Sequence, residues 1–123
     1  MLEAPVREVT VLAAGGTIGM SQKDNGGAVP SLDADALVRA VPPLAQVAGL
    51  RARTVSTRPS VQLTATEALD IARAAAAAAE AGRGVVVTIG TDTLEEVALL
   101  SDLLYAGEPP VVFTGAMRPA SAL

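Results

Sequence analysis

Three short segments of the chain combine glycine with threonine, aspartate or arginine, residue types suited to chemistry at a ligand site. They are residues 15–18 (GGTI), 90–93 (GTDT) and 115–118 (GAMR). A threonine hydroxyl becomes a nucleophile when a base takes its proton, and a carboxylate binds an ammonium group through a charge-assisted hydrogen bond. Glycine allows a backbone to leave a strand and to approach a ligand closely.

Each of these segments taken alone is also typical of an ordinary turn. Glycine permits the exit from a strand, and threonine or aspartate caps the helix that follows. Residues 15–16 also look like part of a phosphate-binding loop, but the chain has neither the G-x-G-x-x-G spacing nor the Walker lysine there. We therefore expect no nucleotide site.

The composition narrows the chemistry further. The chain has 123 residues with no cysteine and no histidine, so it has no thiolate nucleophile, and a hydrolytic mechanism needs another kind of general base. A formal net charge of −4, one tyrosine and one phenylalanine argue against nucleic-acid binding. No apolar segment approaches the roughly 20 residues that cross a bilayer, and residues 1–7 do not form a secretory signal. We expect a cytoplasmic protein that binds neither nucleic acid nor a membrane.

The three segments follow predicted β-strands. Apolar runs predict strands at residues 9–14, 85–89 and 109–114, and a weaker alternation predicts one at residues 51–56. Helices are predicted at residues 33–41, at residues 64–81 and from residue 93 onward. Residues 20–30 favour a hairpin or a loop. The pattern indicates an α/β fold, a doubly wound, mostly parallel sheet with helices on both faces, which binds ligands beyond the carboxyl ends of its strands.

Local signals predict where the helices begin. Asp33 is a predicted N-cap, and the spacing of Thr64 and Glu67 predicts a capping box. The same spacing from Thr93 to Glu96 predicts a second capping box. An apolar face is predicted for this last helix, formed by Leu94, Val97, Ala98 and Leu104.

Taken together, four segments resemble the bacterial-type asparaginase and glutaminase family. Residues 14–18 resemble its first signature, residues 88–96 its second, and residues 59–64 the substrate-binding segment between them. Residues 114–119 follow at the distance that the family shows, and the similarity extends over residues 9–123. The resemblance implies an L-asparaginase-type amidohydrolase, which converts L-asparagine to L-aspartate and ammonia without a cofactor or metal.

The resemblance also implies roles for individual residues. Thr17 matches the nucleophile, and Thr91 matches a second catalytic threonine that works with Asp92 and a lysine. Asp92 also matches the residue that holds the substrate's α-ammonium group. Thr17 as a turn residue and Asp92 as a helix cap are the competing interpretations.

Substrate-binding residues follow from the same comparison. Ser60 matches the residue that binds the α-carboxylate, although a serine after a proline is also common in turns. Ala116 matches the position whose backbone carbonyl accepts a hydrogen bond from the leaving amide. Gly90 belongs to the substrate-binding strand end.

Several positions depart from the family pattern. The only lysine, Lys23, lies in the first loop and does not match the catalytic lysine, which the family carries further downstream. Ala28 stands near the position of the lid tyrosine, Val61 where a polar substrate contact is common, and Ile89 where histidine is usual. The expected source of the general base is therefore absent from this chain.

The family's architecture implies how the chain is organised. We expect residues 1–7 to be an N-terminal tail and residues 8–123 to be part of the N-terminal α/β domain, with the rest of that domain and a second domain absent. Family active sites are completed between subunits, which implies a homo-oligomer, a dimer or tetramer. We expect this chain to be a truncated product or a partial sequence, inactive on its own. A non-catalytic amino-acid-binding remnant and a related glutamine amidase are the alternatives.

Overall fold

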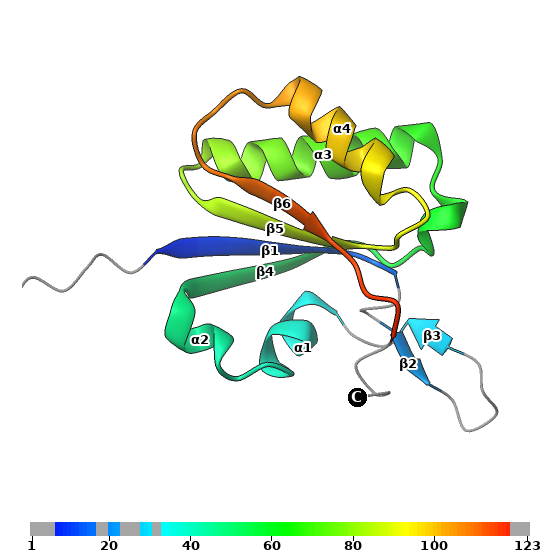
Figure 1. Ribbon diagram of the computed structural model, residues 1–123, viewed down its shortest axis with the longest axis horizontal. Helices are drawn as coiled ribbons and strands as arrows, with labels where there is room; N and C mark the ends of the chain where they lie inside the picture. The colour runs from blue at the N-terminus through cyan, green and yellow to red at the C-terminus, as the bar shows by residue number, and fades with distance from the viewer. Residues whose placement is uncertain (1–6, 17–19, 23–27, 31–32, 119–123) are drawn as a thin grey trace, which may run out of the picture.

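Four parallel strands form the sheet that organises this chain. The structure, a computed structural model, describes residues 7–16, 20–22, 28–30 and 33–118. The strands are β1 (Glu8–Ala14), β4 (Gly49–Ser56), β5 (Gly84–Ile89) and β6 (Val111–Thr114). They lie in the order β4-β1-β5-β6, and each neighbouring pair is parallel (Figure 1). The predicted parallel sheet is confirmed.

The strand boundaries differ from the predictions by up to two residues. β4 begins earlier than predicted, because the backbone N–H of Gly49 already donates to the carbonyl of Arg7. β6 begins later than predicted, after Pro109 and Pro110, since proline has no backbone N–H to donate to a neighbouring strand.

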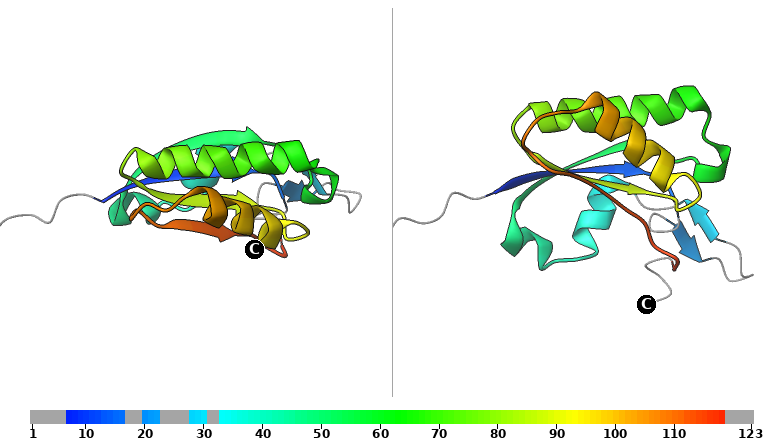
Figure 2. Two further views of the ribbon diagram at one scale, coloured as in Figure 1. Left: turned by 90° about the horizontal axis from the view of Figure 1, so that it is seen from above. Right: turned by 45° about the horizontal axis from the view of Figure 1, so that its top comes forward.

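Helices cover both faces of the sheet, which confirms the doubly wound arrangement. Helices α3 (Ala65–Glu80) and α4 (Leu94–Leu104) pack against each other on one face (Figures 1 and 2). Helices α1 (Ala34–Arg39) and α2 (Leu44–Val47) lie on the other face. The predicted helix at residues 33–41 ends at Arg39, and the separate short helix α2 follows Pro42 and Pro43.

Residues 20–30 include the predicted hairpin. Strand β2 (Met20–Gln22) pairs antiparallel with β3 (Ala28–Pro30), beyond the carboxyl ends of the main sheet (Figures 1 and 2). Residues 23–27, between the two strands, lie outside the described residues.

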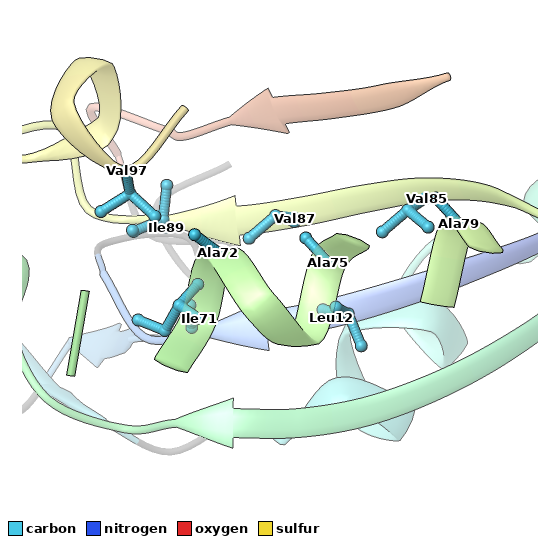
Figure 3. Packing of buried hydrophobic residues seen from close by; sticks show 10 residues of the cluster. Leu12, Ile71, Ala72, Ala75, Ala79, Val85, Val87, Ile89 and Val97 are labelled. Atoms are coloured by element: carbon cyan, nitrogen blue, oxygen red, sulfur yellow. The ribbon is translucent and has the colours of Figure 1, made fainter. Parts of the chain in front are cut away.

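The core lies between the sheet and α3. Branched side chains of the strands face small alanines of the helix, which lets the helix backbone approach the sheet closely (Figure 3). Its fully enclosed members include Leu12, Val85, Val87 and Ile89 from the sheet, Ala72, Ala75 and Ala79 from α3, and Val97 from α4. Close packing of this kind makes the core sensitive to added volume.

The predicted helix starts are confirmed at two of three places. The Asp33 side chain accepts from the Ala36 N–H, and Thr64 forms a complete capping box with Glu67. The capping box predicted at Thr93 is wrong: Thr93 occupies the N-cap of α4, but its side chain makes no capping hydrogen bond. Its hydroxyl donates to the backbone carbonyl of Ser60 instead.

The predicted apolar face of α4 is correct except at its end. Val97 is fully buried, and Leu94 packs against the core. Leu104, the last residue of the helix, is 45% exposed, so this face is less buried at its end. The helix ends at Leu104, and Tyr105, in an extended conformation, packs against the core.

Candidate active site

The carboxyl ends of β1 and β5 meet at the switch point of the sheet, where the order in which successive strands are added reverses. The two strands are neighbours, and Ala14 pairs with Ile89 at their ends. After β1 the chain leads to α1 on one face, whereas after β5 it leads directly to α4 on the opposite face (Figure 1). Such a switch point leaves a crevice that binds ligands in open α/β sheets. Gly15 and Gly90 therefore leave the sheet side by side.

Close backbone approach explains the glycines at these strand ends. Gly16 has a φ of +86°, and a Cβ atom added to it would lie 2.3 Å from the backbone nitrogen of Gly90. Gly15 has a φ of +76°, and an added Cβ would lie 2.4 Å from the carbonyl oxygen of Arg58. The exit from β1 is thus packed against both the exit from β5 and the segment that follows β4.

Ser60 is the most enclosed polar residue at this switch point. It begins the short 3-10 helix η2 (Ser60–Gln62) and is 2% exposed. Its Oγ atom donates to Oδ2 of Asp92 over 3.2 Å, and its carbonyl accepts from Thr93 Oγ1 over 3.4 Å. A Cβ added to Gly90 would lie 2.3 Å from Ser60 Oγ. Gly90, Asp92 and Thr93, which follow β5, therefore hold Ser60 in place.

The remaining predicted site residues are arranged around this pair. Asp92 and Thr91 are both exposed at the end of β5. A Cβ added to Gly115 would lie 3.0 Å from Thr91 Cγ2, so the end of β6 is also close. Ala116 follows Gly115 and is partly buried. Thr17 lies outside the described residues.

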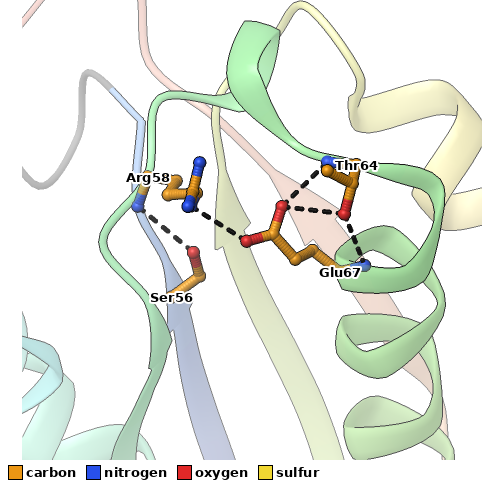
Figure 4. A network of polar contacts seen from close by, with 4 residues as sticks. All are labelled: Ser56, Arg58, Thr64 and Glu67. Carbon is orange, nitrogen blue, oxygen red and sulfur yellow. Dashed lines mark hydrogen bonds and ion pairs between the residues drawn. The ribbon is translucent and has the colours of Figure 1, made fainter.

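A polar network anchors the segment that carries Ser60. Arg58 Nε pairs with Glu67 Oε1 over 2.9 Å, and the Arg58 N–H donates to Ser56 Oγ (Figure 4). The N–H and the hydroxyl of Thr64 both donate to Glu67 Oε2, over 2.8 Å and 2.9 Å. These bonds from Thr64, with a smaller contribution from Arg58, hold the pKa of the Glu67 carboxyl below its usual value. The sequence predicted the capping box, but not that Arg58 joins it.

A second feature lies on the face of the sheet covered by α1 and α2. An apolar cavity of about 490 Å³ lies between these helices and the sheet, and Val11, Leu37 and Val86 are among the residues that line it. Thr88 also lines this cavity, and among the described residues its buried hydroxyl has no hydrogen-bond partner. Ser60 and Asp92 do not line this cavity, but Ala116 at the end of β6 does, so the cavity reaches one residue of the strand-end site.

These features define a doubly wound α/β protein with a candidate site of polar residues at the switch point of its sheet. A family model described as "Asparaginase, N-terminal" matches residues 8–123. The chain belongs to the asparaginase family.

Relatives that resemble the chain carry asparaginase names. It is 36% identical over 121 residues to a probable periplasmic L-asparaginase of Haemophilus influenzae, covering 96% of this chain and 35% of that protein. It is 37% identical over 124 residues to a glutaminase-asparaginase of Acinetobacter glutaminasificans, covering 94% of this chain and 37% of that protein. The crystal structure of a probable cytoplasmic L-asparaginase from Campylobacter jejuni superimposes with a TM-score of 0.81 at 33% identity, covering 94% of this chain and 36% of that one.

The chain spans about a third of the length of these relatives. One relative is named as periplasmic and another as cytoplasmic. Within the described ranges, no helix is long and apolar enough to cross a membrane.

Proposed function

We propose that this chain supplies the amino-acid-binding groups and the nucleophile of an L-asparaginase-type amidohydrolase. The reaction is hydrolysis of the side-chain amide of L-asparagine, which gives L-aspartate and ammonia. The observation that carries the proposal is the contact between Ser60 and Asp92, which are 32 positions apart in sequence and meet at the switch point of the sheet. A hydroxyl donor beside a carboxylate suits a ligand that has its own carboxylate and ammonium groups.

The proposed binding roles follow from the charges of these groups. The Asp92 carboxylate accepts hydrogen bonds from the α-ammonium group of the substrate. Ser60 turns its hydroxyl, which donates to Asp92 in the ligand-free protein, towards the α-carboxylate. Gly90 keeps space for Ser60, and the backbone carbonyl of Ala116 accepts a hydrogen bond from the leaving amide.

The proposed chemical steps use the two threonines. Thr17 attacks the side-chain carbonyl carbon to form an acyl-enzyme and release ammonia, and water then hydrolyses the ester. Thr91 is the second catalytic threonine and works together with Asp92. The resemblance puts the lysine that works with Thr91 and Asp92 further downstream in the family, and Lys23 does not match it, so we propose that this lysine is supplied from outside residues 1–123.

We propose that residues 8–123 are part of a larger N-terminal α/β domain. We also propose that the working enzyme is a homo-oligomer. The 123-residue chain alone should bind L-aspartate without releasing ammonia from L-asparagine. The length of the relatives supports the first of these statements.

A chimera tests the activity. Residues 8–123 replace the matching segment of the Haemophilus influenzae relative, and ammonia release from L-asparagine is measured. We expect activity in the chimera and a loss of about a thousandfold or more in Thr17→Ala and in Thr91→Val. Thr10→Val, in the middle of β1, is the matched control and should keep the activity.

Two results would contradict the proposal. Unchanged activity in both threonine variants would reject the assigned mechanism. A folded chimera that binds L-aspartate but releases no ammonia would favour the non-catalytic alternative. Rates on L-glutamine, compared with L-asparagine, separate an asparaginase from a glutamine amidase, which the name of the Acinetobacter relative makes a specific candidate.

A further inference from the structure

Thr93 occupies a capping position but does not cap its helix. A threonine at an N-cap normally accepts a hydrogen bond from a backbone N–H in the first turn. Thr93 makes no such bond at the start of α4, and its backbone has φ −129° and ψ 12° rather than the extended conformation usual at an N-cap. Its hydroxyl donates instead to the carbonyl of Ser60, across 33 positions of sequence. The side chain therefore serves a contact other than helix initiation.

The partner of Thr93 is a residue with little freedom to move. Ser60 is 2% exposed, and its Oγ atom donates to Asp92. Gly90 lies so close to Ser60 Oγ that there is no space between them for a side chain at position 90. Gly90 and Asp92 act on the side chain of Ser60, whereas Thr93 acts on its backbone. The Thr93 contact fixes the peptide from which the Ser60 hydroxyl projects.

We propose that Thr93 is a positioning residue, which orients Ser60 for the α-carboxylate of an amino-acid ligand. The inference rests on the proposed function, because it assigns a purpose to Ser60 in that site. At 3.4 Å the Thr93 contact is longer than the roughly 2.7–2.8 Å typical of a hydroxyl donor, so it contributes little to overall stability.

Three variants of the 123-residue chain test this role. Thr93→Val removes the donor but keeps the shape, and Thr93→Ser keeps the hydroxyl. Thr54→Val is the matched control, because the Thr54 hydroxyl also bonds to the backbone, at Ala34, but away from Ser60. Calorimetric titrations use L-aspartate and its α-amide, which lacks the free α-carboxylate. NMR spectra of the ligand-free variants record the Ser60 and Asp92 resonances.

We expect Thr93→Val to shift the Ser60 and Asp92 resonances and to weaken L-aspartate binding about two- to threefold, the effect of losing one weak hydrogen bond. Binding of the α-amide should change little, so the preference for L-aspartate over its α-amide should fall by the same factor. Thr93→Ser should restore that preference, and Thr54→Val should leave it unchanged. If Thr93 had only a structural role, Thr93→Val would weaken the binding of both ligands equally.

Two results would overturn the inference: unchanged Ser60 resonances in Thr93→Val, or equal L-aspartate affinity in Thr93→Val and the wild type. A wild-type chain that binds neither ligand would count against the proposed function and against a role in ligand binding. In that case the Ser60 resonances still decide whether Thr93 positions Ser60.

Discussion

Ser60 and Gly90 show how single residues determine the geometry of the strand-end site. The Ser60 hydroxyl occupies the space that a side chain at position 90 would need. Asp92 then receives the Ser60 hydroxyl because the two are held at hydrogen-bond distance. The position of the buried Ser60 side chain therefore depends on the lack of a side chain at Gly90, two residues before the acceptor Asp92.

We predict that Gly90→Ala displaces Ser60. The added methyl group would lie 2.3 Å from Ser60 Oγ, which should destabilise the fold by about 1–3 kcal/mol and abolish detectable L-aspartate binding. Chemical denaturation and calorimetry measure the two effects. Gly84→Ala, at the opposite end of β5, is the control, because its added methyl group would make only ordinary contacts at 3.8 Å. Equal effects of the two substitutions would contradict this explanation.

Glu67 makes the anchor of the Ser60 segment sensitive to acid. Its pKa is lowered from 4.5 in the folded state by the Thr64 bonds, so its stabilising contribution is present above about pH 4.5 and is lost as the pH falls through the lower folded value. The free energy of unfolding of the wild type should therefore exceed that of Glu67→Gln at neutral pH. The difference should shrink as the pH falls below 4.5. A difference that stays constant with pH would show that the charge of Glu67 has no part in it.

The candidate residues differ in how far sequence predicts their contacts. The Thr64 capping box was predictable, because both partners lie within one turn of helix. Thr93 has the same local spacing, but its hydroxyl bonds to a residue 33 positions away, which local spacing does not encode. The closeness of Ser60 and Asp92 was likewise implied only by resemblance to a family, since their contact depends on how the strands are ordered in the sheet.

At the scale of elements, the order of strands and helices was predicted well, and their ends less well. Buried strands and long helices have strong apolar patterns, as in β5 and α3. Where a strand or helix begins or ends depends on single backbone groups. For example, β6 begins only after Pro109 and Pro110, which have no N–H group to donate. The predicted helix at residues 33–41 ends at Arg39, just before Pro42 and Pro43, and α2 begins separately after these prolines.

The alanines of α3 set its distance from the sheet. Ala75 is completely buried beneath the helix, whereas Ala77 is exposed on its outer side. We predict that Ala75→Leu lowers the free energy of unfolding by about 1–3 kcal/mol, because the core has no space for three more carbon atoms. Ala77→Leu should change it by less than about 0.5 kcal/mol. Thermal or chemical denaturation measures both, and equal effects would contradict close packing of α3 on the sheet.

At the scale of the whole molecule, the two faces of the sheet differ. The face under α3 and α4 has a closely packed core, whereas the face under α1 and α2 has an apolar cavity of about 490 Å³. Val47, which lines that cavity, is 75% exposed. The sequence pattern predicted helices on both faces of the sheet, but not that the apolar packing would differ between the faces.

The apolar surface around the cavity, which includes the exposed Val47, predicts self-association of the 123-residue chain. Apolar patches of this kind commonly form interfaces or cause aggregation. We expect the sedimentation coefficient to rise with protein concentration, and Val47→Lys to reduce that rise. A substitution that adds the same charge elsewhere, Gln62→Lys, is the control. A monomer at every concentration would contradict the prediction.

We propose that the ends of β1 and β5 and the segment after β4 form one amino-acid site. A crystal structure of the protein with L-aspartate tests it most directly. The account predicts the α-ammonium group against the Asp92 carboxylate and the α-carboxylate within hydrogen-bond distance of Ser60 Oγ. L-Aspartate bound elsewhere, or bound here with its α-groups turned away from both residues, would contradict it.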